Sequence, residues 1–149
     1  RLIDHDVILF QFPLYWYSTP SLLKEWQDLV LQHGFAYGHD GNALAGKTLM
    51  LAITAGGSDE AYSTEGYQQY PLRTFLTPLE QTARLCKMSF PAPYVLHSAL
   101  NPEEQSGIPQ HTEGYVRLLT AIRDNAYDLA SAKAREIVTF ANLPILSKA

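Results

Sequence analysis

The sequence predicts an α/β domain in which a parallel sheet carries helices on both faces. Three apolar runs of strand length stand at Val7–Phe12, Thr48–Thr54 and Tyr94–His97, and each precedes a segment with helical spacing of apolar residues. This alternation is typical of parallel sheets, because parallel strands are joined by crossover helices. The chain has 149 residues, 46% of them hydrophobic and 17% charged. That composition suits one globular domain over residues 1–149.

The first unit is a strand followed by a helix. Val7–Phe12 is apolar except for Gln11, as expected for a strand buried on both faces of the sheet. Thr19 and Pro20 then resemble an N-cap followed by a proline at the first helical position. Apolar residues recur at helical spacing up to a typical stop at Gly34. They are Leu22, Leu23, Trp26, Leu29 and Val30. We expect this stripe to pack in the core or at a subunit interface.

The second unit begins with a buried strand at Thr48–Thr54 and continues through a loop of small and polar residues, Ala55–Gly66. A helical face follows, made by Leu72, Phe75, Leu76, Leu79, Ala83 and Cys86. Pro78 lies inside this face and predicts a kink or a new helix start, because proline lacks the N–H that a helix interior needs. Cys86 is predicted to be a buried structural thiol.

The third unit is a short strand, Tyr94–His97, followed by a last helix. The apolar face of that helix is predicted to run through Tyr115, Leu118, Leu119, Ile122, Ala126 and Leu129. In a parallel sheet, ligands bind in the loops at the carboxyl ends of the strands. The loops Pro13–Thr19 and Ala55–Gly66 both leave strands at that edge. The first of them carries several aromatic rings, and flat rings at such an edge suit a flat aromatic ligand.

A glycine pair in Ile53–Ser58 adds to this expectation. Gly56 and Gly57 follow a buried strand, and residues without side chains let backbone N–H groups approach a ligand closely. Taken alone, the stretch is better explained as a tight turn. Its position beside the aromatic loop favours a binding role, since the first two strands should be neighbours.

One motif is misleading. Gly41–Thr48 matches the phosphate-binding pattern G-x-x-x-x-G-K-T. A true loop of this type follows a strand and opens a helix, whose N-terminus helps to hold phosphate. Here the pattern leads into the strand Thr48–Thr54, so we expect a plain connecting loop.

Charge and cysteine content exclude several classes of protein. The net charge is −4 and no basic cluster is present, which argues against nucleic-acid binding. The five histidines are scattered without metal-ligand spacing, so no metal site is predicted. The apolar runs are too short to span a membrane, and the one cysteine fits a reducing compartment. These features favour a cytoplasmic location.

Several motifs, in order, resemble the flavodoxin-like NAD(P)H:quinone oxidoreductases. They are Phe12-Pro13-Leu14-Tyr15-Trp16-Tyr17, Pro20, Leu23-Lys24, Trp26, Gly34-Phe35-Ala36-Tyr37, Ile53-Thr54-Ala55-Gly56-Gly57-Ser58 and Tyr62. Within this family the chain is most similar to the bacterial ancillary proteins of glutathione-regulated potassium efflux. It is more distantly similar to the mammalian quinone reductase DT-diaphorase. The resemblance covers about Asp6 to Pro93.

The resemblance implies a flavin, FMN or FAD, and a ping-pong reaction in which hydride passes from NAD(P)H to the flavin and then to a quinone. It implies Tyr62 as a catalytic side chain that hydrogen-bonds beside the ring system. The implied cofactor-binding residues are Pro13, Leu14, Tyr15, Trp16, Tyr17, Thr54, Ala55, Gly56, Gly57 and Tyr62. The backbone N–H groups of Trp16 and Tyr17 would face one edge of the ring, and those of the glycine pair would face its pyrimidine end.

The resemblance also implies a homodimer with a flavin at each subunit boundary. Phe35, Tyr37 and His39 of one subunit would cover the substrate pocket of the other. The alternative function is a non-enzymatic regulatory subunit with the same fold that binds a potassium-efflux transporter. In that case the protein would lie peripherally at the inner face of the membrane.

Two departures from the family matter. Gln68 stands where DT-diaphorase has a histidine, and an amide does not titrate, which argues against a proton-shuttling role at that position. Nothing in the chain matches the family's first strand, its phosphate-binding loop or its second strand. The chain is therefore either a fragment of a longer protein or a degenerate member of the family. We expect it to hold flavin weakly and to form a sheet of three strands.

Overall fold

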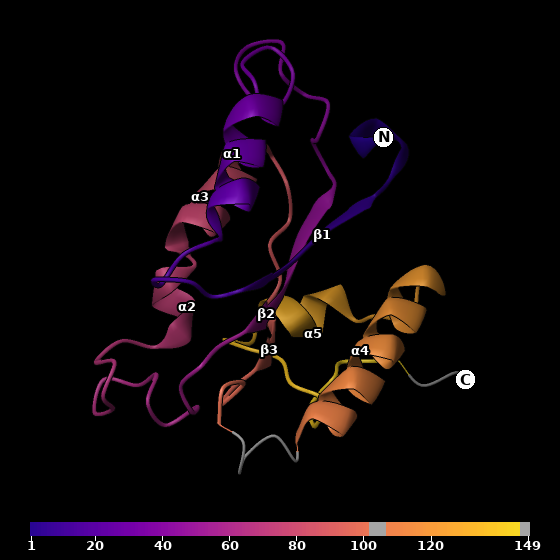
Figure 1. Ribbon diagram of the computed structural model, residues 1–149. Helices are drawn as coiled ribbons and strands as arrows, with labels where there is room; N and C mark the ends of the chain where they lie inside the picture. Colours follow the sequence, from indigo (N-terminus) through magenta and orange to yellow (C-terminus); the bar gives the residue numbers. More distant parts are fainter. Residues whose placement is uncertain (102–106, 147–149) are drawn as a thin grey trace.

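The computed structural model describes residues 1–101 and 107–146. Its centre is a sheet of three parallel strands in the order β1–β2–β3 (Figure 1). The strands are β1 (Val7–Pro13), β2 (Thr48–Thr54) and β3 (Tyr94–Leu96). The predicted parallel sheet and its three strands are confirmed, with β1 one residue longer and β3 one residue shorter than expected.

The register of the strands brings their carboxyl ends together. Pro13 pairs with Thr54, and Thr54 pairs with Leu96, so all three strands end at one edge of the sheet. The loops that leave β1, β2 and β3 therefore meet at this edge. One backbone hydrogen bond already joins the first two, because Leu14 N–H donates to the carbonyl of Thr54 at 2.8 Å.

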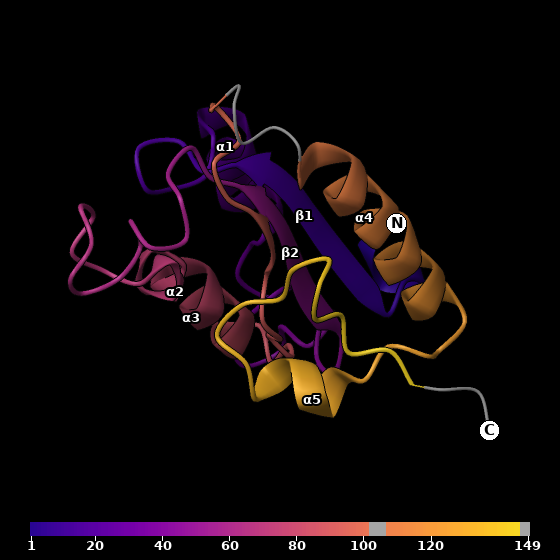
Figure 2. The same cartoon turned by 90° about the horizontal axis from the view of Figure 1, so that it is seen from below.

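Helices cover both faces of the sheet (Figure 2). One face carries the first three helices and the other carries the last two. They are α1 (Ser21–Val30), α2 (Leu72–Phe75), α3 (Thr77–Leu85), α4 (Ile108–Arg123) and α5 (Leu129–Lys133). A short 3₁₀ helix, η1 (Leu2–Asp4), precedes β1. The arrangement confirms the predicted two-faced α/β architecture.

The central strand β2 shows why a continuous apolar run forms a strand here. Leu49, Leu51 and Ile53 pack into the core under α1, α2 and α3. Met50 and Ala52 point the opposite way, into the core under α4 and α5. Alternate side chains of a strand face opposite sides, so a strand between two helical layers needs apolar residues at every position.

The start of α1 differs from the prediction. The helix begins at Ser21, and Pro20 rather than Thr19 occupies the N-cap position, with extended backbone at ψ 149°. No side chain caps this end, although the carbonyl of Pro20 accepts hydrogen bonds from the N–H groups of Leu23 and Lys24. Pro78 behaves as predicted, since it lies in the first turn of a new helix, α3.

The last predicted helical face is divided between two helices. α4 ends at Arg123, and Asn125 adopts a left-handed backbone with φ 53°, which no helix continues through. The N–H of Ser131 then donates to the carboxylate of Asp128 at 3.0 Å, which caps the start of α5. Ala126 therefore lies in the turn, and Leu129 belongs to α5.

Candidate functional site

A strained turn follows β1. Tyr15 and Ser18 exchange two backbone hydrogen bonds, at 3.0 and 2.9 Å, and close a two-residue turn around Trp16 and Tyr17. Both central residues have positive φ, 48° and 62°. Turns of this type normally use Asn and Gly, because a left-handed backbone costs other residues about 1–2 kcal/mol each. Strain of this kind is concentrated at functional sites, where it fixes side chains that a relaxed turn would place elsewhere.

The rings of this turn do not contribute to the core. The side chain of Trp16 is 93% exposed and that of Tyr17 is 46% exposed. The Tyr17 ring packs on Phe75 of α2, with ring centroids 4.9 Å apart. One ring is therefore held in place while the other stands open to solvent. The turn therefore presents bulky aromatic residues at the edge of the sheet instead of burying them.

The glycine loop after β2 forms a second wall. Ala55 N–H donates to the carbonyl of Leu96 at 2.8 Å, and Ser98 N–H donates to the carbonyl of Gly57 at 2.9 Å. These bonds attach the loop to the segment after β3. By contrast, the N–H groups of Gly56 and Gly57 donate no hydrogen bond within the described part of the chain. The wall therefore offers free backbone donors.

The two walls border an open hollow of about 230 Å³. It is lined by Leu14, Trp16, Tyr17, Gly56, Gly57, Tyr62, Gln68 and Leu100. On the first wall, the N–H groups of Trp16 and Tyr17 also donate no hydrogen bond to any described residue. Rings and unpaired backbone donors thus line the same hollow from both walls. Such a set can stack on a flat ligand and donate hydrogen bonds to its edge.

Tyr62 lies between the hollow and the interior. Its ring is half-buried and contacts the rings of Phe75 and His97, with centroids 6.1 and 5.8 Å away. Burial raises the pKa of the Tyr62 hydroxyl, and the nearby Tyr17 raises it further. The hydroxyl therefore stays protonated at neutral pH and is available as a hydrogen-bond donor.

The structure brings together part of the predicted cofactor set. Leu14, Trp16, Tyr17, the glycine pair and Tyr62 line the hollow, as stated above. Ala55 is buried, and Tyr15 is exposed outside the lining. Pro13 and Thr54, at the ends of the paired strands β1 and β2, line a separate hollow.

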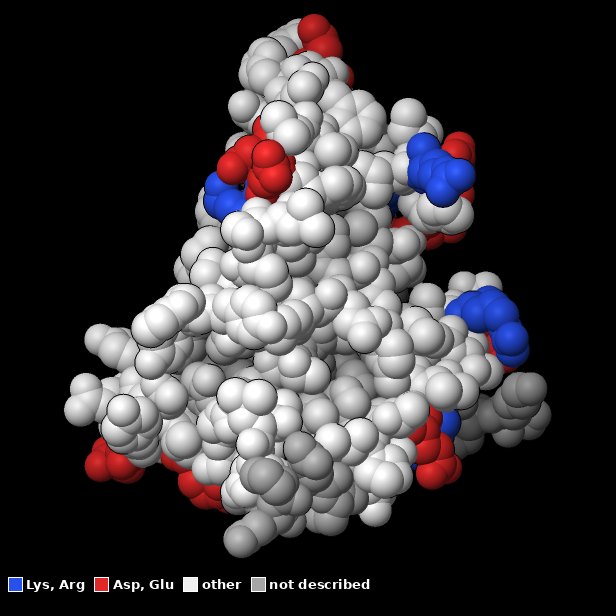
Figure 3. Space-filling view, in the orientation of Figure 1, with Lys and Arg blue, Asp and Glu red and all other residues white. Residues whose placement is uncertain are grey.

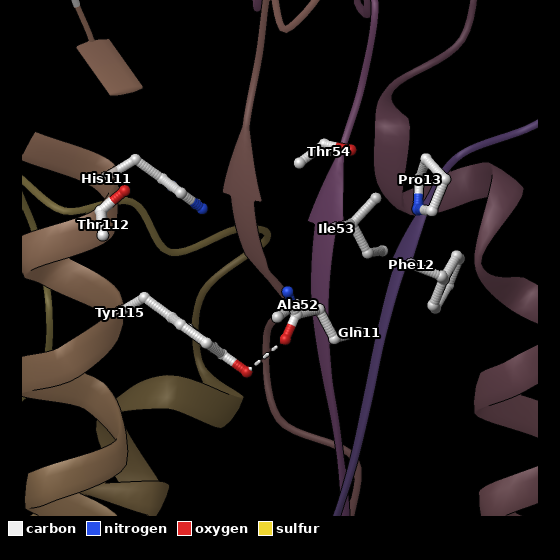
Figure 4. Close-up of a pocket in the computed structure, with 9 residues that line it drawn as sticks. All are labelled: Gln11, Phe12, Pro13, Ala52, Ile53, Thr54, His111, Thr112 and Tyr115. Carbon is white, nitrogen blue, oxygen red and sulfur yellow. Dashed lines mark hydrogen bonds between the residues drawn. The ribbon is translucent and has the colours of Figure 1, made fainter. Parts of the chain in front are cut away.

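That second hollow, of about 470 Å³, lies between the sheet and α4 (Figure 4). The hydroxyl of Tyr115 reaches across from α4 and donates to the side-chain oxygen of Gln11 at 2.8 Å. His111 points into the same space, and its ring stacks on Tyr94 with centroids 4.5 Å apart. No predicted site residue except Pro13 and Thr54 lines it.

The predicted substrate-pocket residues lie elsewhere in the chain. Phe35, Tyr37 and His39 belong to the connection between α1 and β2, which meets the sheet at the amino end of β2 (Figure 1). The ring-lined hollow is at the opposite, carboxyl edge. Phe35 and Tyr37 are half-buried against the core, and His39 is exposed beside Asp40. Within one chain these residues do not join the hollow, and their predicted role requires a second subunit.

Besides Gln68, three residues of the site were not predicted. Phe75 supports the rings of Tyr17 and Tyr62, but its helical spacing marked it only as a core residue. Leu100 lines the hollow, and its side chain is 81% exposed. His97 packs behind Tyr62, and only its place at the end of the third predicted strand could have indicated this.

The phosphate-like motif is a connecting loop, as predicted. It ends where β2 begins, at Thr48. Its lysine, Lys47, donates from Nζ to the carbonyls of Ile3 and His5 at 2.9 and 2.7 Å. This side chain therefore joins the segment before β1 to the loop and is not directed at a phosphate.

The surface and the helices give two further findings. On the face shown in Figure 3, the described lysines and arginines are scattered around the rim and leave the middle of the face uncharged. None of the helices in residues 1–101 and 107–146 combines the length and the apolar character needed to cross a membrane.

The fold and the site together define a class. The protein is a doubly wound α/β domain with a ring-lined pocket where strand ends meet. More specifically, the chain belongs to the family described as flavodoxin-like fold, whose sequence profile matches residues 1–119. The resemblance found in the sequence is thereby confirmed.

Known proteins support this assignment. The glutathione-regulated potassium-efflux system ancillary protein KefG of Cronobacter sakazakii (strain ATCC BAA-894) is 47% identical over 118 residues, which are 79% of this chain and 64% of that protein. A structure of general stress protein 14 from Treponema denticola, in complex with FMN, is similar with TM-score 0.74 and 32% identity, over 80% of this chain and 68% of that one. A structure of an NADPH-quinone reductase from P. pentosaceus is similar with TM-score 0.64 and 34% identity, over 70% of this chain and 63% of that one.

The chain is shorter than these relatives. It spans 54% to 64% of the length of the first curated relatives that it matches.

Proposed function

We propose that this protein is a flavin-dependent NAD(P)H:quinone oxidoreductase that binds FMN in the ring-lined hollow. The observation that carries the proposal is the combination of exposed rings and unpaired backbone N–H groups on two facing walls. The similar structure of general stress protein 14, which contains FMN, favours FMN over FAD. The similarity to an NADPH-quinone reductase supports the reaction class.

The residues of the hollow fit an isoalloxazine ring. That ring is flat and aromatic, and it carries carbonyl and ring-nitrogen acceptors along its edge. The open ring of Trp16 offers a stacking surface. The free N–H groups of Trp16, Tyr17, Gly56 and Gly57 offer donors for the edge. Unpaired donors of this kind bind most strongly where negative charge develops, which is the principle of electrostatic catalysis.

A bound flavin would supply the redox chemistry by accepting hydride from NAD(P)H and passing it to the quinone in ping-pong order. The protein's own residues position the ring and its substrates. Trp16 and Tyr17 cover one side and exclude water, and the hydroxyl of Tyr62 donates a hydrogen bond. Pro13, Tyr15, Thr54 and Ala55 hold the two walls in place through the ends of β1 and β2 and the loops that follow them. No side chain has to act as a nucleophile.

The substrate site is completed by a second subunit in this proposal. Phe35, Tyr37 and His39 of a partner chain would lie over the hollow and form the quinone pocket. A homodimer with twofold symmetry gives each subunit the same contact. The apolar side chains that remain exposed on α1, Leu22 and Leu29, are 76% and 63% exposed and favour an interface on this face.

A second candidate function is the regulation of a potassium-efflux transporter. The 47% identity to KefG, an ancillary protein of such a system, favours it. The two functions are compatible, because a flavin site can also serve as a sensor of the redox state. A measurement of quinone reduction distinguishes the two functions.

The test begins with the absorption spectrum of the purified protein in the near-ultraviolet and blue. FMN is then titrated while its fluorescence is followed, and the oxidation of NADPH and NADH is measured with a soluble benzoquinone. We expect FMN binding and quinone-dependent oxidation, with Tyr62→Phe slower than wild type. FMN binding without turnover would favour the regulatory function. No binding of FMN or FAD at any concentration would refute the proposal.

A further inference from the structure

A buried histidine lies directly behind one wall of the hollow. His97 follows β3 at the carboxyl edge of the sheet, and its side chain is only 11% exposed. Its ring centroid is 5.8 Å from that of Tyr62, which lines the hollow. The next residue, Ser98, donates its N–H to the carbonyl of Gly57 on the same wall. A titratable ring thus lies against Tyr62 and is adjacent in the chain to the residue that bonds to Gly57.

The surroundings of His97 suit a protonated ring. Its Nε2 lies 3.3 Å from Oδ1 of Asp59, and the backbone of Gly57 also favours the charged form. Neither ring nitrogen makes a hydrogen bond of good geometry to any described residue. A neutral imidazole has one N–H donor, whereas an imidazolium has two. The carboxylate of Asp59 and the backbone of Gly57 can therefore both accept a hydrogen bond from the ring only after His97 gains a proton.

Burial keeps the ring neutral in the resting state. Desolvation lowers the pKa of His97 and outweighs the carboxylates of Asp59 and Glu60, which raise it. Tyr62, the other titratable group against the ring, stays protonated because burial raises its pKa. A nearby negative charge attracts the protonated ring. Additional negative charge beside His97 therefore raises its pKa.

We propose that His97 is the proton-accepting residue of this site and takes up a proton from solvent when negative charge enters the hollow beside Gly57 and Tyr62. The inference rests on the proposed function. Gln68 lines the hollow but cannot perform this task, since an amide does not titrate. His97 acts through Tyr62 and Gly57 and is not itself part of the lining, so it is a positioning and charge-compensating residue.

The charges balance over the reaction cycle. Hydride transfer from NAD(P)H into the hollow adds one negative charge there. One solvent proton binds the free ring nitrogen of His97, which becomes a cation and forms an ion pair with Asp59. When hydride leaves with the quinone, one proton must accompany it to complete the hydroquinone. His97 releases its proton at that step and returns to the neutral form.

The first experiment follows the imidazole resonances of His97 by NMR from about pH 5 to about pH 8, the range that brackets its ordinary pKa. Spectra are taken of the protein alone, with FMN, and with FMN reduced by dithionite. We expect the midpoint of the His97 titration to rise when the FMN is reduced. Asp59→Asn should lower the midpoint in every state. An unchanged midpoint on reduction would overturn the inference, and this measurement needs no variant at position 97.

The second experiment measures the midpoint potential of bound FMN against pH. At pH values between the titration midpoints of His97 with oxidised and with reduced FMN, wild type should take up one more proton per two electrons than His97→Gln. His5→Gln is the matched control, because His5 is exposed and distant in sequence from the site, and it should keep the wild-type dependence. Equal pH dependence in wild type and His97→Gln would overturn the inference about His97 but leave the proposed function standing. Failure of FMN to bind at any pH would instead refute the proposed function.

Discussion

Replacing Trp16 by alanine separates a binding role from a structural one. The Trp16 side chain is 93% exposed, so its removal takes little apolar area out of the core. The left-handed backbone at this position is equally strained for alanine. The free energy of unfolding should therefore change by no more than about 0.5 kcal/mol. Loss of stacking on a flat ring costs about 1–3 kcal/mol. We expect FMN to bind about five- to 150-fold more weakly, at about 1.4 kcal/mol per tenfold.

The assay has two parts. FMN affinity is measured by fluorescence quenching, and the melting temperature of the apoprotein is measured in parallel. Tyr67→Ala is the matched control, because that ring is 89% exposed in the loop after β2 but does not line the hollow. Its FMN affinity should equal that of wild type. If Trp16→Ala keeps wild-type affinity, the open ring is not part of the cofactor site.

Three further predictions follow from the structure. Gly57→Ala should weaken FMN binding about five- to 150-fold, because a Cβ there would lie 3.1 Å from Tyr62 Cε2 and crowding of this kind costs about 1–3 kcal/mol; unchanged affinity would show that the wall is pliable. Burial lowers the pKa of His97 and His111, so the unfolded chain binds more protons below about pH 6.5 and stability should fall as the pH drops through the folded pKa values. Thermal melts of wild type and His97→Gln across this range should differ in slope, and parallel curves would contradict the assignment. Leu29→Glu should convert the proposed dimer to a monomer with little change in melting temperature, since this side chain is 63% exposed on α1; a monomeric wild type in sedimentation at micromolar concentration would contradict the interface.

Hydrophobic pattern was sufficient to predict the sheet but not every helix boundary. The runs at β1 and β2 needed apolar residues on both faces, and that requirement is visible in the sequence alone. The helical spacing past Arg123 was misleading, because Ala126 and Leu129 fall on the same face only if the chain continues as one helix. The left-handed residue Asn125 ends α4, and nothing in the spacing indicates it.

The candidate site was predictable as a pair of loops rather than as a full set of contacts. Strand order alone placed the aromatic loop beside Gly56 and Gly57, because carboxyl ends of neighbouring parallel strands share an edge. Which residues face the hollow depends on the turn geometry, which turned Tyr15 outward and left Trp16 on the wall. The position of His97 behind Tyr62 depends on packing between β3 and the loop after β2, which local sequence does not encode.

The left-handed turn at Trp16 and Tyr17 has a consequence for protein engineering. A designer who aims only at thermostability would replace this pair by Asn-Gly, which adopts the same turn without strain. Relief of about 1–2 kcal/mol per residue would make the variant attractive in a screen based on melting temperature alone. The same change would delete one wall of the hollow. Under the proposed function, stability and FMN binding therefore compete for the same two residues, and a screen for robust variants must include a binding measurement to keep the site.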